Sequence, residues 1–218
     1  MMPGRLVAPA LFPFVVFFML GVFAWPRSSH ALLTYRGVRM YLSGNAVWAR
    51  ANGAALLSDS ALKGIKDQTS KTGFGLGAQL EILTSRSISV AAGVIWLNKK
   101  IVWCEQDVSV YPYLMLPVTM RFWPFPYLFV GMGAYYARLV GPVSPAPLPV
   151  PFEAWGIKGY DYGILAGGGL AFQFIPGFSL FGDGWYAFGL PNISQNPPTA
   201  TTVFWRDIIV QFGVRFGW

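Results

Sequence analysis

The chain has 218 residues, of which 54% are hydrophobic and 17% aromatic, while only 11% are charged. Soluble domains carry about 25% charged residues, so this composition argues against an ordinary soluble domain. The formal net charge is +7, but the Lys and Arg residues are scattered and the longest basic run is Lys99-Lys100, so nucleic-acid binding is not expected. The single cysteine, Cys104, excludes an intrachain disulfide.

The N-terminus has the features of an export signal. Arg5 precedes a long apolar stretch, residues 6–25, and Ser29 and Ala31 are small residues at the spacing that a signal peptidase reads. We therefore predict a signal peptide over residues 1–31, cleaved after Ala31, and a mature domain over residues 32–218. An uncleaved anchor helix is the alternative. Cleavage would remove His30, the only histidine.

The rest of the chain has no apolar run of 18 residues, the length that a membrane-spanning helix needs. Apolar residues instead alternate with small or polar ones, and this period of two indicates strands with two unlike faces. In chain order the predicted strands are residues 36–48, 72–84, 88–97, 108–122, 127–137, 160–174, 178–190 and 204–218. We expect an all-β fold, an eight-stranded antiparallel transmembrane β-barrel with its apolar face toward lipid. Pro117 lacks the N–H that a ladder needs, so we also expect a bulge there.

The predicted connections alternate between long and short. The long ones are residues 49–71, 98–107, 138–159 and 191–202, and the short ones are residues 85–87, 123–126 and 176–177. Outer-membrane barrels have long loops outside and short turns in the periplasm, so both termini should be periplasmic. The third long loop has five prolines between Pro142 and Pro151, which predicts a stiff, extended segment.

Aromatic residues gather near both ends of the predicted strands, which is typical of interfacial girdles. The residues assigned to the short-turn girdle are Trp123, Tyr127, Phe178 and Trp218, and those assigned to the long-loop girdle are Trp48, Trp96, Tyr136 and Trp205. The aromatic core of a soluble β-barrel is the alternative interpretation.

Even-numbered residues are predicted to face lipid, which places three cations and three anions inside: Arg39, Glu81, Arg121, Asp161, Asp183 and Arg215. Charges in a narrow barrel are costly unless they are paired, and eight strands leave just enough room for side chains. We therefore expect a structural ion-pair network that fills the lumen; a polar path for a small solute is the alternative. The glycines of Gly73–Gly77 repeat at period two without a following helix, so they fit small inward residues better than a phosphate loop.

No catalytic, cofactor-binding or metal-binding site is predicted. The mature chain would have no histidine to act as a base, and it has no cluster of His, Cys and carboxylate residues suited to a metal. An envelope enzyme that uses Asp161 and Asp183 as a carboxylate pair is the remaining hypothesis of this class.

The order of several motifs resembles the PorT-like outer-membrane β-barrel family, related in shape to the small OmpA/OmpX-type barrels. The resemblance spans about residues 35–218, with Met115 where the family often has an acidic residue and Trp185 where it often has arginine. The matching stretches are Lys71-Thr-Gly-Phe-Gly-Leu-Gly77, Tyr113-Leu-Met-Leu-Pro117-Val-Thr-Met-Arg-Phe122, Tyr127-Leu-Phe-Val-Gly-Met-Gly133, Asp161-Tyr-Gly163 and Trp185-Tyr-Ala-Phe-Gly-Leu190. The resemblance implies a fold and a compartment, and it implies little about function because family members linked to secretion act as parts of larger machines.

These observations predict an integral barrel of the cell outer membrane with a structural or interaction role, alone or within an envelope or secretion assembly. The expected partners are outer-membrane lipid, the barrel-insertion machinery and an envelope protein. The resemblance to outer-membrane proteins implies that the insertion machinery reads a C-terminal signal made of Phe212, Val214, Phe216 and Trp218. A narrow channel for small or hydrophobic solutes, suggested by the inward glycines, is the alternative function.

Overall fold

The computed structural model describes residues 37–55, 69–102, 108–143, 158–192 and 201–217. The chain divides into two compact units, Met1–Leu32 and Leu33–Trp218. The first unit, with the predicted signal peptide and its cleavage site, lies outside the described residues. The proline-rich part of the third long loop, residues 144–157, lies outside them too.

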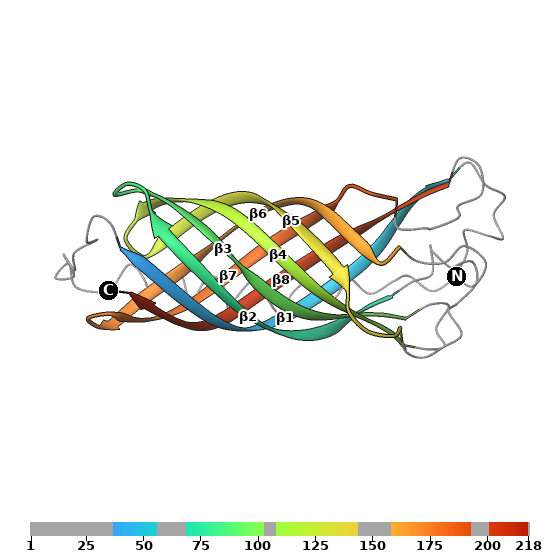
Figure 1. Cartoon of the computed structure of the whole chain (residues 1–218), viewed down its shortest axis with the longest axis horizontal. Helices are drawn as coiled ribbons and strands as arrows, with labels where there is room; N and C mark the ends of the chain where they lie inside the picture. The colour runs from blue at the N-terminus through green and yellow to red at the C-terminus, as the bar shows by residue number, and fades with distance from the viewer. Residues whose placement is uncertain (1–36, 56–68, 103–107, 144–157, 193–200, 218) are drawn as a thin grey trace, which may run out of the picture. The chain divides into compact units, whose positions relative to one another are not determined.

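The second unit is a closed antiparallel barrel of eight strands in which each strand pairs with its neighbours in the sequence and β1 pairs with β8 (Figure 1). The strands are β1 Val38–Ala55, β2 Thr69–Leu83, β3 Ile88–Val102, β4 Val108–Phe125, β5 Leu128–Leu139, β6 Tyr160–Ile175, β7 Phe178–Gly189 and β8 Thr201–Gly217. The fold class, the number of strands and the antiparallel order are those that the period-two pattern predicted.

Several strands extend further toward the long-loop end than predicted. β1 continues to Ala55, which pairs with Thr201, and β3 continues to Val102, which pairs with Thr69. The prediction ended these strands at residues 48 and 97, because beyond those points the outward positions lose their apolar character. Backbone pairing does not require an apolar face, so the ladder continues through Lys99 and Lys100, which the sequence analysis had wrongly assigned to a loop.

At the other end the turns are tight. β4 runs on to Phe125, so the predicted turn over residues 123–126 is too long, and the turn that joins β4 to β5 is Pro126-Tyr127. The turn at Pro176-Gly177 is as predicted, and Gly177 has a φ of 78°. This left-handed conformation favours glycine, because any other residue would bring its Cβ against the backbone.

The bulge expected at Pro117 is absent. Pro117 pairs with Tyr135 of β5 in regular register, and on the β3 side the register is the same before and after it, from Ala92 opposite Val118 to Ile95 opposite Met115. The missing N–H therefore interrupts the β3–β4 pairing without inserting a residue. The β4–β5 register instead shifts next to the turn, between Phe122 and Phe125.

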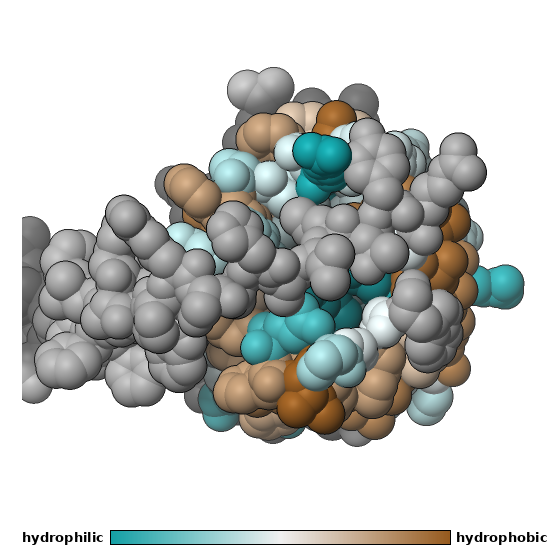
Figure 2. Space-filling view, turned by 90° about the vertical axis from the view of Figure 1, so that its left-hand side faces the viewer, coloured by the Kyte–Doolittle hydropathy of each residue, from teal (hydrophilic) through white to brown (hydrophobic). Residues whose placement is uncertain are grey.

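The two faces of the barrel differ as predicted: along most of each strand odd-numbered residues lie inside and even-numbered residues outside. The exceptions lie beside register shifts, where the odd-numbered Lys71, Phe125 and Ile175 are exposed. Seen from the short-turn end, hydrophilic side chains lie within a ring of hydrophobic ones (Figure 2). Exposed apolar residues occur on all eight strands, for example Leu76, 68% exposed, and Phe212, 66% exposed. No helix among the described residues is long and apolar enough to span a membrane.

Two residues assigned to the aromatic girdles are inside the barrel. Trp123 is 3% exposed and Trp205 is fully buried, because both have odd numbers on regular strands. Trp96 and Tyr136 do face outward, at 40% and 45% exposure. At the short-turn end the ring of Tyr127 stacks on those of Phe125 and Phe172 on the outer face.

Candidate functional site: the charged barrel interior

All six charged residues predicted to face inward do so. Five of them are buried, and the side chain of Arg39 is 13% exposed. The described strands place two more charges inside, Lys99 and Asp207, at 1% and 0% exposure. Lys99 was missed because its segment was assigned to a loop, whereas Asp207 has the odd number that would have identified it. The interior of the described barrel then holds four cations and four anions.

The Glu81 cluster, formed by Arg39, Tyr41, Glu81, Ser89 and Arg121, lies in the half of the barrel near the short turns. One oxygen of Glu81 accepts hydrogen bonds from the Tyr41 hydroxyl at 2.5 Å and from Arg39 at 3.3 Å. The other accepts from the Ser89 hydroxyl at 2.6 Å and lies 3.8 Å from Nη1 of Arg121. Both oxygens of this fully buried carboxylate therefore have donors, as a buried charge requires.

Arg121 links the Glu81 cluster to the middle of the barrel. Its Nη2 donates to Gln79 at 2.7 Å, and Gln79 in turn donates to Gln211 at 3.1 Å. Its guanidinium lies 4.8 Å from the ring centre of Phe129 and 5.7 Å from that of Trp185. Aromatic faces attract a cation, so these rings offset part of the hydration energy that Arg121 loses on burial.

Arg215 and Asp183, the other two interior charges near this cluster, lie outside the ion pairs described above. Arg215 donates to the Ser179 hydroxyl at 3.0 Å, and its guanidinium lies 5.5 Å from the ring centre of Trp123. Asp183 is 4% exposed and lies opposite Gln211 of β8. The ion pairs of the described residues do not extend to Arg215 or Asp183, so the predicted network is only partly connected through ion pairs.

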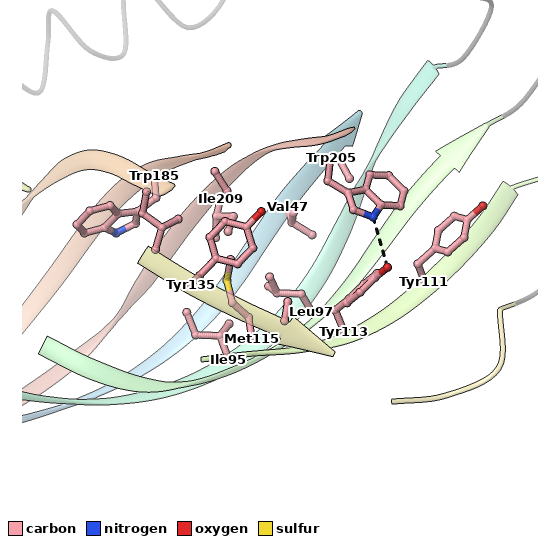
Figure 3. Close-up of a cluster of buried hydrophobic side chains, with 14 of the residues drawn as sticks. Val47, Ile95, Leu97, Tyr111, Tyr113, Met115, Tyr135, Trp185, Trp205 and Ile209 are labelled. Atoms are coloured by element: carbon pink, nitrogen blue, oxygen red, sulfur yellow. Dashed lines mark hydrogen bonds between the residues drawn. The ribbon is translucent and has the colours of Figure 1, made fainter. Parts of the chain in front are cut away.

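The Lys99 cluster, formed by Lys99, Tyr113, Asp161, Trp205 and Asp207, lies in the half near the long loops. Nζ of Lys99 is 2.6 Å from a carboxylate oxygen of Asp207 and 3.7 Å from one of Asp161. The ring centres of Tyr113 and Trp205 are 4.6 and 4.8 Å from the same nitrogen. The indole N–H of Trp205 donates to the Tyr113 hydroxyl at 3.3 Å (Figure 3), which fixes both rings against the lysine.

Asp161 and Asp183 are not brought together. Asp183 is opposite Gly169 across the β6–β7 ladder, and Asp161 lies eight residues from Gly169 along β6. At about 3.3 Å per residue this is a separation of roughly 26 Å along the strand. The structure therefore does not form the carboxylate pair that the enzyme hypothesis needed, and among the described residues no group of three or more His, Cys, Asp or Glu residues could hold a metal ion.

Between the two clusters the interior is closely packed. The cavity found there has a volume of about 10 Å³, at the lower limit for a single water molecule. Figure 3 shows side chains from different strands converging on this part of the barrel. The cavity is lined by Gln79, Ile95, Met115, Pro117, Thr119, Arg121, Leu165, Trp185, Ile209 and Gln211. Met115 and Trp185, the two positions that depart from the PorT-like pattern, therefore line the same cavity.

The inward glycines are places where large neighbours come close. A Cβ added at Gly131 would lie 3.0 Å from the Trp185 ring, and one added at Gly75 would lie 2.8 Å from the Leu97 side chain. Contacts this short force neighbouring atoms to move. These glycines thus leave room for side chains of adjacent strands rather than for an open path.

The residues of the predicted C-terminal signal lie on the outer face of β8. Phe212 is largely exposed, and Val214 and Phe216 are partly exposed. The ring centre of Phe216 lies 5.6 Å from that of Phe178. Trp218 lies outside the described residues. The outward direction of the first three is as expected, and their reading by the insertion machinery stays a prediction.

No family model matches the chain, and no curated protein matches it. The solved structures that it resembles include the outer membrane protein OprG from Pseudomonas aeruginosa, at 10% identity and a TM-score of 0.55 over 84% of this chain and 96% of that one. AlkL in DMPC bilayers matches at 13% identity and a TM-score of 0.48 over 89% and 95%, and the E. coli outer membrane protein W at 14% and 0.45 over 86% and 100%. The likeness to OprG shows the fold, an eight-stranded barrel like those of outer membrane proteins. The resemblance to the PorT-like family stays a prediction.

Proposed function

We propose that the chain is an integral outer membrane β-barrel with a side-chain-filled lumen and a structural or interaction role. The observation that carries the proposal is the interior itself, where the segment packed between the Glu81 and Lys99 clusters holds a cavity of about 10 Å³. A hydrated ion needs a continuous wide path. An interior so filled fits a barrel that acts through its loops or outer face.

The location in the outer membrane is supported by the chemistry of the two faces. Large apolar residues are exposed on every strand, while all four acidic residues that the structure describes are buried inside. In water this arrangement would expose apolar surface on the whole circumference, whereas in a bilayer it places that surface against lipid. Export through a signal peptide over residues 1–31, long loops on the extracellular side and membership of the PorT-like family belong to the same proposal.

Ion conductance across a planar bilayer tests the filled lumen. We expect the purified full-length protein to give no steady conductance. The comparison variant Trp185→Ala with Leu165→Ala removes two large side chains from the lining of the cavity but leaves the Glu81 and Lys99 clusters in place, so it should also give no steady conductance. Steady conductance of the unaltered protein would overturn the proposal in favour of a narrow channel.

The inward glycines first suggested that channel, but their neighbours fill the adjacent space. The ring of Tyr135 lies 2.9 Å from where a Cβ of Gly163 would be, and the Ser43 hydroxyl lies 2.8 Å from where one of Gly77 would be. The packing therefore favours a structural or interaction role over the channel.

The interaction role is tested by the native mass of the protein extracted from outer membranes in mild detergent. We expect a stoichiometric envelope partner to remain bound, so that the mass exceeds that of the chain with its detergent. Elution of the chain alone, at the same mass before and after a stringent detergent wash, would contradict the interaction role and leave the structural one.

A further inference from the structure

The charged residues that the structure describes on the outer face are all cations, whereas the interior holds equal numbers of cations and anions. Arg50 on β1, Lys71 on β2, Lys100 on β3 and Arg206 on β8 lie near the long-loop ends of four adjacent strands, and each is exposed or partly exposed. We call these four residues the rim cluster. All acidic residues that the structure describes point into the barrel; the nearest in the chain, Asp207, follows Arg206 directly, but its buried carboxylate is paired with Lys99.

The strand register places these cations directly opposite one another. Arg50 is paired with Arg206 across β1 and β8, and Lys71 with Lys100 across β2 and β3. Like charges on directly opposed residues destabilise an antiparallel pair. Neighbouring strands are about 4.8 Å apart, so the four cations span roughly 15 Å of the circumference. An anion shared by each pair would reverse the sign of the interaction.

Two cations of the rim cluster are held at the edge of the outer apolar surface nearest the long loops. Arg206 donates to the carbonyl oxygens of Gly189 at 2.6 Å and Trp205 at 2.8 Å, and its guanidinium lies 5.5 Å from the ring centre of Phe188. Nζ of Lys100 lies 5.7 Å from the ring centre of Phe74, which is 62% exposed. These contacts fix the charges where an apolar belt ends, which is the level of lipid headgroups in a membrane.

We propose that the rim cluster binds the phosphate groups of an anionic lipid in the membrane leaflet at the long-loop end. The inference rests on the proposed membrane location. Lipid phosphates are the anions present in quantity at that level, and two cation pairs about two strand spacings apart fit a headgroup with two phosphates. The register, and not the net charge, identifies the site, because Arg138 on β5 is also exposed at this end but lies opposite Leu114 and Tyr160.

The test measures binding of a bis-phosphorylated glycolipid, lipid A, to the full-length protein in zwitterionic micelles by native mass spectrometry. We expect the double variants Arg50→Gln with Arg206→Gln and Lys71→Gln with Lys100→Gln each to lower the affinity about thirtyfold, since each cation near an anionic lipid surface contributes about fivefold. Arg138→Gln is the matched control and should leave the affinity unchanged.

Three outcomes would overturn the proposal: unchanged affinity in both double variants, equal loss in Arg138→Gln, or equally tight binding of inorganic pyrophosphate, which would mean that free phosphate suffices. Folding of every variant is recorded separately in phosphatidylcholine bilayers by the shift in gel mobility on heating. A protein that does not insert contradicts the proposed function, whereas an inserted protein that does not bind lipid A contradicts only this inference.

Discussion

At the scale of single residues, Glu81 is the carboxylate that compensates the buried cations in the half of the barrel near the short turns. It is fully buried and faces two arginines, Arg39 and Arg121, together with the hydroxyls of Tyr41 and Ser89. Glu81→Ala would remove the ion-pair partner of both guanidinium groups. Removing one partner of a buried ion pair lowers the free energy of unfolding by about 3–5 kcal/mol.

Urea unfolding of the protein in lipid vesicles, followed by tryptophan fluorescence, measures this loss. Tyr41→Phe is the matched control, because it removes one hydrogen bond to the same carboxylate while keeping the buried ring, and it should cost about 1 kcal/mol. Equal effects of the two variants would show that the charge of Glu81 is not what stabilises this half of the barrel.

In the half of the barrel near the long loops, Lys99 has the corresponding role with the opposite charge. It is the cation between Asp161 and Asp207, so Lys99→Met leaves two buried carboxylates close to each other. We expect a loss of about 3–5 kcal/mol in the free energy of unfolding. Adding Asp207→Asn to this variant should recover part of the loss, by about 1–3 kcal/mol, because it removes one of the uncompensated charges. Strictly additive effects in the same urea assay would contradict the ion pair.

At the scale of the element, β3 has two outward valines at different expected depths in the membrane, so the same substitution at both tests the effect of depth alone. Val90 and Val94 both face outward, at 38% and 45% exposure, but Val90 is near the short turn and Val94 is closer to the middle of the strand. An arginine that faces lipid costs about 2–4 kcal/mol at the middle of a bilayer and about 0–1 near the interface. We therefore expect Val94→Arg to destabilise the folded protein in vesicles by clearly more than Val90→Arg. Equal, small effects would contradict a lipid-facing β3.

β8 contains the prediction about insertion. Trp218→Asp should lower the amount of protein in isolated outer membranes, because it places a charge in the predicted C-terminal signal. Trp218→Phe, which keeps an aromatic end, should leave the amount near normal. Immunoblots of membrane fractions compare the two, and normal levels of Trp218→Asp would refute the signal.

At the scale of the whole molecule, closure of the barrel depends on close approach along the seam between β1 and β8. Gly213 lies opposite Ser43, and a Cβ at this glycine would collide with the backbone of β1. Gly184 on β7 has nothing within 4 Å of such a Cβ. Gly213→Val should thus prevent closure while Gly184→Val does not. The shift in gel mobility on heating, which folded barrels show and open ones lack, distinguishes them, and a normal shift for Gly213→Val would contradict the seam geometry.

Much of this molecule follows from alternation along the chain. The period of two identified eight strands and their apolar faces, and parity alone placed Arg39, Glu81, Arg121, Asp161, Asp183 and Arg215 inside the barrel. Both are local properties, because successive side chains of a strand point to opposite faces whatever lies across the sheet. Parity would also have placed Asp207, Trp123 and Trp205 inside, had it been applied to them.

The tertiary structure decided what parity leaves open. Strand ends depend on backbone pairing with a neighbour, so Lys99 lies inside the barrel although its segment has no apolar alternation. Ladder register placed Asp161 far from Asp183 and set Arg50 opposite Arg206. The register on both sides of Pro117 is also unchanged, so this proline causes no bulge. The sequence by itself therefore determined the fold and the direction of most side chains. The partners of each charge, and the side chains beside register shifts such as Lys71, were decided by the register and closure of the barrel, because these are relations between strands distant in the chain.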